Sequence, residues 1–122
     1  MKKILIVSLM LFTCMGILVA CGEKNKYDEA IDSCIKHENE YWKNNFSETE
    51  AKQIKRENAE IKVYDDGKYI KLKFPEVQYE TEYKKDSDGK YSLPSSDERE
   101  YIENDAKLVY YEKKGKPQKI QN

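Results

Sequence analysis

The stretch EIKVYDDGKYIKLKF, residues 60–74, alternates apolar and polar side chains on both sides of the dipeptide Asp66-Gly67. Asp-Gly is favoured in two-residue type I′ turns, which connect antiparallel strands. This turn sets a register whose facing pairs on one side are Ala59–Phe74, Ile61–Leu72 and Val63–Ile70. The facing pairs on the other side are Glu60–Lys73, Lys62–Lys71 and Tyr64–Tyr69. Because pattern and turn agree, the sequence predicts a β-hairpin with one apolar and one polar face.

A second hairpin is predicted directly after the first. Residues 77–84 alternate apolar and polar side chains, which is typical of a half-buried strand. A three-residue loop, Ser87-Asp88-Gly89 with Gly89 in the left-handed conformation, keeps the apolar faces consistent and places Leu93 opposite Tyr83. A two-residue turn at the same place would move the apolar side chains of the returning strand to the wrong face.

The remaining segments carry weaker signals. Residues 94–99 are polar and predict a loop with at most one helical turn, and residues 107–113 (KLVYYEK) predict the last strand. The segment from residue 115 has no pattern and is predicted to fray. Ser47 is predicted to cap a short helix that ends near Asn58.

Residues 27–42 carry apolar side chains three and four positions apart, which predicts an amphipathic helix. The members of this stripe are Tyr27, Ala30, Ile31, Cys34, Ile35, Tyr41 and Trp42. Cys34 is therefore interpreted as a buried core residue. Glu38 falls in the middle of the same face and leaves two interpretations open: a carboxylate that lines a pocket, or a charge that reaches water where the helix overhangs the sheet. His37, the single histidine, is predicted to be solvated.

Composition restricts the classes of function. The chain has 22 basic and 23 acidic residues, evenly mixed, so there is no electrostatic case for nucleic acid. Ten tyrosines and one tryptophan add to a modest aliphatic content, and the length suits one small domain. The sequence has no glycine-rich phosphate loop, no serine-nucleophile motif and no metal-ligand spacing. We therefore predict a monomer without catalytic residues, cofactor or metal.

The N-terminus reads as an export signal. Two lysines precede an uncharged apolar run over residues 4–20, and the run ends in Leu18-Val19-Ala20-Cys21. This tetrad resembles the lipobox of bacterial lipoproteins. The resemblance implies cleavage between Ala20 and Cys21 and a diacylglyceryl group on the Cys21 sulfur, which would anchor the protein to the extracytoplasmic face of the cell membrane. The expected organisation is a signal peptide (1–20), a tether (21–26), one domain (27–114) and a frayed tail (115–122).

Several segments together resemble a known family. The segments that carry this resemblance are the lipobox, the start of the predicted helix and two predicted strand segments. Their sequences are KYDEAID (26–32) for the helix, and DGKYIKLKF (66–74) and LVYYEKKGK (108–116) for the strands. The chain is similar to the small cystatin-like fold lipoproteins of Gram-positive bacteria. This resemblance implies an α+β fold, with an N-terminal helix packed on an antiparallel sheet of about four strands. Some members are similar to surface-exclusion lipoproteins of conjugative elements, which block redundant DNA entry.

True cystatins present a Gln-x-Val-x-Gly hairpin tip to cysteine proteases. The hairpin tips here are Asp66-Gly67 and Ser87-Asp88-Gly89, so the resemblance does not imply protease inhibition.

Two hypotheses for function follow. The first is a non-enzymatic binding module for an envelope protein or peptide, with a contact patch of tyrosines at strand positions: Tyr64, Tyr69, Tyr110 and Tyr111. Alternating tyrosines also simply pack, and we expect packing for about half of them. The sharpest form of this hypothesis is an exclusion or immunity-type inhibitor of a conjugation or secretion machine. The alternative is a small enzyme or ligand-binding protein with a pocket between helix and sheet, for which Glu38, His37 and a tyrosine are the available side chains.

Overall fold

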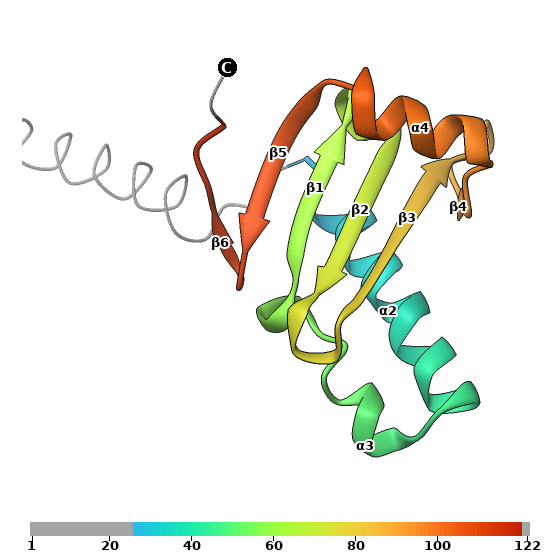
Figure 1. The fold of residues 1–122 in the computed structure, drawn as a ribbon, viewed down its shortest axis with the longest axis vertical. Helices are drawn as coiled ribbons and strands as arrows, with labels where there is room; N and C mark the ends of the chain where they lie inside the picture. Colours follow the sequence, from blue (N-terminus) through green and yellow to red (C-terminus); the bar gives the residue numbers. More distant parts are fainter. Residues whose placement is uncertain (1–25, 121–122) are drawn as a thin grey trace, which may run out of the picture.

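The computed structural model describes residues 26–120, which form an α+β fold with a long helix followed by a six-stranded antiparallel sheet (Figure 1). The predicted signal peptide, the lipobox and most of the predicted tether fall within residues 1–25, which lie outside the described residues. Within the described part, no helix combines the length and the apolar character needed to cross a membrane.

The strand order in the sheet is β4-β3-β2-β1-β5-β6. The strands are β1 (Glu60–Tyr64), β2 (Tyr69–Phe74), β3 (Tyr79–Lys85), β4 (Tyr91–Ser92), β5 (Leu108–Lys113) and β6 (Lys116–Pro117). The helices are α2 (Asp28–Asn45), α3 (Glu48–Ala51) and α4 (Ser96–Asn104). The count differs from the four strands expected because two-residue strands, β4 and β6, extend the edges of a four-stranded centre. One of them, β6, forms where the sequence predicted a frayed tail, and it pairs with the end of β5.

The first hairpin has the predicted register, with Val63 opposite Ile70 and Ile61 opposite Leu72. Asp66 and Gly67 have φ of 55° and 99°, and positive φ at both central positions is what a type I′ turn requires. Val63, Ile70, Ile61 and Leu72 are all buried. The dipeptide and the alternation therefore decide the centre of the sheet, as predicted.

The second hairpin also has the predicted register, but β4 ends at Ser92, before the predicted pair of Leu93 and Tyr83. Lys85 faces Tyr91, Lys84 faces Ser92, and Gly89 has φ of 85° in the connecting loop. The start of β3 was predicted wrongly, because residues 75–77 form a 3₁₀ turn after Pro75 and Gln78 is left-handed at φ 51°. The strand begins at Tyr79, not Val77.

Helix α2 packs its apolar stripe against the sheet. Ile31, Cys34, Ile35 and Trp42 are buried as predicted, whereas Tyr41 is 45% exposed. The following α3 begins as predicted, because the Ser47 hydroxyl accepts from the Glu50 N–H at 3.0 Å. It ends at Ala51 and not near Asn58. The Asn39 amide of α2 donates to the carbonyls of Ala51 at 2.7 Å and Ile54 at 3.2 Å, which ends the helix with satisfied acceptors.

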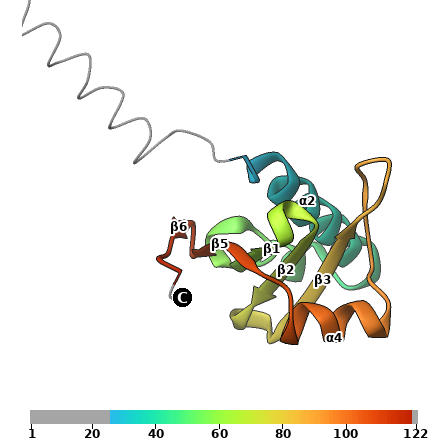
Figure 2. The same ribbon diagram turned by 90° about the horizontal axis from the view of Figure 1, so that it is seen from above.

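Helix α4 replaces the loop predicted after Pro94 and lies on the side of the sheet away from α2 (Figure 2). Its start is a capping box: the Ser95 hydroxyl accepts from the Glu98 N–H, and the Glu98 carboxylate accepts from the Ser95 N–H. These bonds and the ion pair with Lys84 lower the pKa of Glu98 to about 2. Ile102 is the apolar side chain that α4 buries. The Ser-x-x-Glu signal was present in the sequence and was missed.

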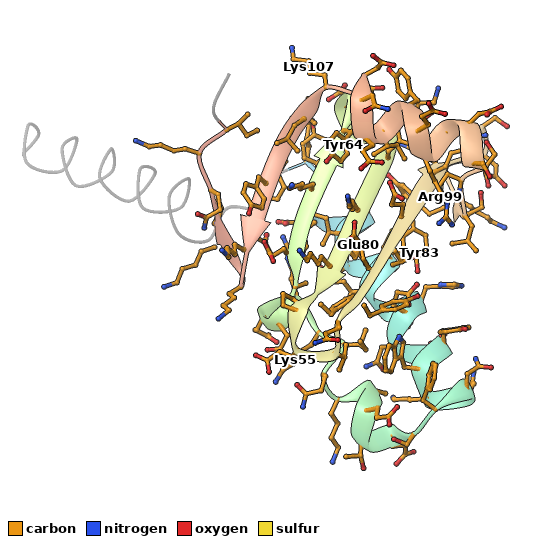
Figure 3. All side chains as sticks on the ribbon, in the orientation of Figure 1. Lys55, Tyr64, Glu80, Tyr83, Arg99 and Lys107 are labelled. Carbon is orange, nitrogen blue, oxygen red and sulfur yellow. The ribbon has the colours of Figure 1, made fainter. Side chains whose placement is uncertain are left out.

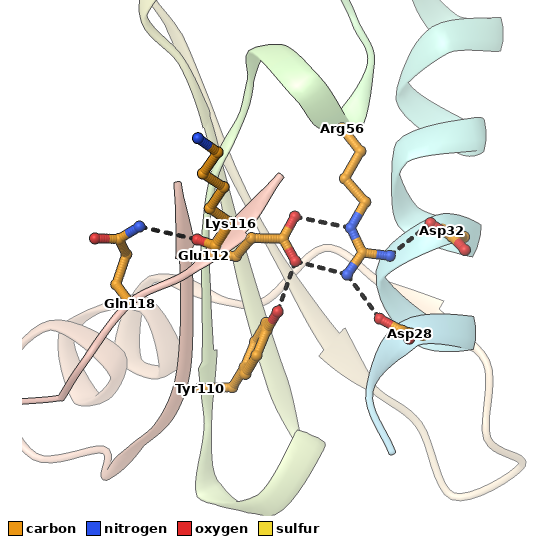
Figure 4. A network of polar contacts seen from close by, with 7 residues as sticks. All are labelled: Asp28, Asp32, Arg56, Tyr110, Glu112, Lys116 and Gln118. Atoms are coloured by element: carbon orange, nitrogen blue, oxygen red, sulfur yellow. Dashed lines mark hydrogen bonds and ion pairs between the residues drawn. The ribbon is translucent and has the colours of Figure 1, made fainter. Parts of the chain in front are cut away.

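A buried ion pair joins three distant segments (Figure 4). Glu112 of β5 is 1% exposed and accepts from Arg56 Nε at 2.8 Å and Nη2 at 2.7 Å. Arg56 also donates to Asp28 at 2.7 Å and Asp32 at 3.0 Å on α2, and Tyr110 donates to Glu112 at 2.6 Å. The hydrogen bond to Glu112 is the main cause that raises the pKa of Arg56. This cluster fixes the start of α2 against β5.

Candidate functional site

A groove of about 500 Å³ lies between the N-terminal half of α2 and the β3–β4 hairpin. Figure 2 shows the loop of the β3–β4 hairpin beside α2. The residues that carry its chemistry are Lys26, Glu29, His37, Tyr83, Lys85 and Lys90. Charged and polar side chains converge on this groove, and it is where we look first for a ligand.

The rim of the groove is predominantly cationic. Lys26 pairs with Asp66 at 2.6 Å, and both side chains are largely exposed. Neither Lys85 nor Lys90 forms an ion pair with any described residue, and Glu29 is the single carboxylate in the lining. An anionic group in this groove would meet these two exposed ammonium groups.

Glu38 and His37, which the sequence named as candidates together with an unspecified tyrosine, meet Tyr83 at the groove. The Tyr83 hydroxyl donates to Glu38 Oε1 in a short hydrogen bond, and His37 Nδ1 lies 3.2 Å from the same hydroxyl. Burial, followed by the contact with Glu38, raises the pKa of Tyr83. The chain His37–Tyr83–Glu38 thus links an exposed imidazole to a buried carboxylate.

The open question about Glu38 has an answer in the structure. Its side chain does not reach water: the residue is 3% exposed, and it lies behind the groove lining rather than in it. One of its oxygens, Oε2, has no hydrogen-bond partner among the described residues. The tyrosine partner was foreseeable, since the predicted register puts Tyr83 on the α2 face of β3 and the stripe puts Glu38 on the inner face of α2.

Cys34 forms part of the groove floor and is a poor nucleophile. It is 1% exposed, and burial, together with the charge of Glu38, raises the pKa of its thiol to about 12. The thiolate, which is the reactive form, is therefore scarce at neutral pH.

The structure separates the four tyrosines of the predicted contact patch. Tyr64 faces Tyr69 and Tyr111 faces Lys62, so these three lie on the sheet face away from α2. Tyr110 faces Val63 on the α2 side. There it packs 6.1 Å from the Tyr27 ring, measured between centroids.

Two of the three tyrosines on the outer face stay accessible. Tyr69 is buried against Tyr101 of α4, with ring centroids 5.8 Å apart. Tyr64 and Tyr111 are half-buried, and Lys62 lies over the Tyr111 ring at 5.4 Å. Figure 3 labels Tyr64 on this face. Cys21 and Ala20, the predicted lipidation and cleavage residues, lie outside the described residues.

The fold defines a small α+β domain, and comparison adds one relative. The chain is 47% identical over 60 residues to "Uncharacterized protein YddJ" of Bacillus subtilis (strain 168). The match covers 49% of this chain and 44% of that protein, so the chain spans less than half of the curated relative it matches. No family model and no solved structure matches the chain.

Proposed function

We propose that this protein is a cystatin-like surface lipoprotein, anchored through Cys21 to the extracytoplasmic face of the cell membrane, that binds a protein or peptide of the envelope without catalysing a reaction. The observation that carries the proposal is the lipobox-like tetrad 18–21, which stands six residues before the start of the folded domain at Tyr27. Six extended residues span at most about 20 Å, so the anchor would hold the domain beside the bilayer.

Confinement to this layer favours one kind of partner. A domain held within about 20 Å of the bilayer has a high effective concentration toward membrane-embedded proteins. An exclusion or immunity-type role, in which the lipoprotein blocks a conjugation or secretion machine in its own membrane, uses this advantage directly. The half-buried Tyr64 and Tyr111 on the outer sheet face support contact with such a partner.

The anchor is tested by metabolic labelling with a lipid precursor. We predict that Cys21→Ser abolishes labelling and leaves an uncleaved precursor, while the control Cys34→Ser keeps the label. Label retained by Cys21→Ser would contradict the proposal. The role is tested in recipient cells, where deletion of the gene should raise conjugative transfer and only the lipidated form should restore the block. Unchanged transfer would remove the exclusion role and leave the binding module.

The groove between α2 and the β3–β4 hairpin supports a second candidate, a protein that binds a small anionic ligand. The free ammonium groups of Lys85 and Lys90 carry this alternative. Inorganic phosphate followed by amide NMR tests it. Shifts at the groove that disappear in Lys85→Ala, but persist in the control Lys119→Ala, would favour the ligand-binding function, and an unchanged spectrum would remove it.

A further inference from the structure

The outer edge of β3 is only partly covered. The Lys85 N–H donates to the carbonyl of Lys68, the residue directly before β2, at 2.8 Å. Since successive residues of a strand direct their backbone groups to opposite edges, Lys84, Glu82 and Glu80 direct theirs away from β2. Strand β4 pairs with Lys84 and then ends. No described residue hydrogen bonds to the backbone of Glu82 or Glu80 on this side.

The cause of the vacancy is Pro94. Continuing the register of β4 places this residue opposite Glu82, where a proline has no N–H to donate. The Pro94 carbonyl instead accepts from Arg99 Nε at 3.4 Å, so the chain leaves the sheet toward α4. The position beside the first half of β3 is left open, as the right-hand edge of the sheet in Figure 1 shows.

Helix α2 provides a floor for a strand at this position. Tyr91 of β4 lines the groove together with Ala30 and Cys34 of α2. His37 and Tyr41 follow along the same flank of the helix at the three- and four-residue spacing. Tyr41 is 45% exposed, and at the other end of the edge Leu93 is 64% exposed. Side chains of an added strand that point to α2 would contact these apolar groups, so they should be apolar.

The other face of the edge carries negative charge. Glu80 and Glu82 alternate with the α2-facing residues of β3, and a strand paired with them would place its own side chains directly opposite. Glu80 is exposed and pairs with Lys71 at 2.6 Å, while Glu82 is half-buried and forms no ion pair with any described residue. Basic side chains at these opposite positions would be favourable.

We propose that an extended segment of the envelope partner, with alternating apolar and basic side chains, adds to the free edge of β3 at Glu80 and Glu82. Pairing by β-strand addition supplies affinity through backbone hydrogen bonds and selects sequence through alternate side chains. The proposal names the kind of partner and rests on the binding function proposed above. In Figure 3 the labels of Glu80 and Tyr83 mark the strand.

The probe is a capped eight-residue peptide of alternating valine and lysine, added to the full-length protein in detergent. Amide hydrogen exchange followed by NMR should show protection of the Glu80 and Glu82 N–H groups. A peptide of the same sequence with every backbone nitrogen methylated should not protect them, because neither of its edges can donate hydrogen bonds to β3. Absence of protection at these two amides, or equal protection by the methylated peptide, would overturn the proposal.

Variants test the two sources of binding separately. Glu82→Pro removes an outward N–H that makes no bond within the sheet, and peptide affinity should fall by about tenfold or more. The double variant Glu80→Lys/Glu82→Lys keeps every backbone N–H and should lose affinity for the peptide by charge repulsion. This variant still tests the proposal if Glu82→Pro fails to fold. Glu57→Lys, at an exposed position of the 3₁₀ turn Arg56–Asn58, is the control and should bind like the wild type. Unchanged affinity in the double variant would contradict the proposal.

Transfer assays separate this proposal from the proposed function. If deletion of the gene raises transfer and the double variant fails to restore the block while Glu57→Lys restores it, both hold. If the double variant restores the block fully, the edge proposal fails and the exclusion role stands. If deletion has no effect but the peptide protects the edge, the exclusion role fails and the edge site stands.

Discussion

The substitution Arg56→Ala tests the ion pair with the buried carboxylate of Glu112. Arg56 holds Glu112 through two hydrogen bonds of 2.8 and 2.7 Å, and Glu112 is 1% exposed on the α2 side of β5. Without the guanidinium, Glu112 keeps the hydrogen bond from the Tyr110 hydroxyl, and the aspartates of α2 lose the cation they share. Leaving a buried charge uncompensated costs about 3–5 kcal/mol. That is a large part of the roughly 5–15 kcal/mol that stabilises a typical domain.

The assay is equilibrium unfolding in urea, followed by the fluorescence of Trp42. A loss of this size should move the midpoint far below that of the wild type, or leave the variant partly unfolded without urea. The matched control is Lys26→Ala, which removes an ion pair whose two side chains are about 70% exposed and should hardly move the midpoint. The double variant Arg56→Leu/Glu112→Leu should recover much of the stability, since it removes the buried charge of Glu112 together with its partner, although Asp28 and Asp32 still lose Arg56. An Arg56→Ala midpoint equal to that of Lys26→Ala would refute this account.

Three further predictions concern the turns, the thiol and acid stability. Gly67→Val should lower the free energy of unfolding by about 1–3 kcal/mol through strain at positive φ. The loss should exceed that of Gly89→Val, because a Cβ at Gly67 would meet the Tyr27 ring at 3.4 Å whereas a Cβ at Gly89 would meet no atom within 4 Å. Equal urea midpoints of the two variants would contradict this prediction. The Cys34 thiol should resist Ellman's reagent at pH 8 until the protein is unfolded, since its pKa is raised to about 12; fast labelling of the native protein would contradict this prediction. Cys34→Ser should lower the free energy of unfolding by only about 1–2 kcal/mol. Because the pKa of Glu98 is lowered from 4.5 to about 2, its contribution to stability is present above pH 4.5 and is lost as the pH falls toward 2. The difference in urea midpoint between the wild type and Glu98→Gln should therefore shrink between these pH values. A difference that stays constant would contradict this prediction.

The sequence by itself determined the hairpins and the long helix, because their signals are local. Asp66-Gly67 combines with strict alternation to allow one register, and a shift by one residue would turn every apolar side chain outward. The same argument selected the loop that ends at Gly89, and the stripe of α2 correctly placed Cys34 in the core. The capping box of Ser95 and Glu98 is equally local, so the sequence also contains the signal for the start of α4.

Only the tertiary structure decided the groups that meet across the chain. The sheet brings Arg56 to Glu112, and α2 brings His37 and Glu38 to Tyr83, which stand more than forty residues apart. Glu38 is polar and sits in an apolar stripe, so its burial depends on a hydroxyl that another strand supplies. The separation of Tyr110 from Tyr64 likewise follows from the register between β1 and β5, which no turn residue encodes. Many pairings of distant segments have similar local propensity, and the burial of apolar side chains in the assembled core stabilises one of them over the others.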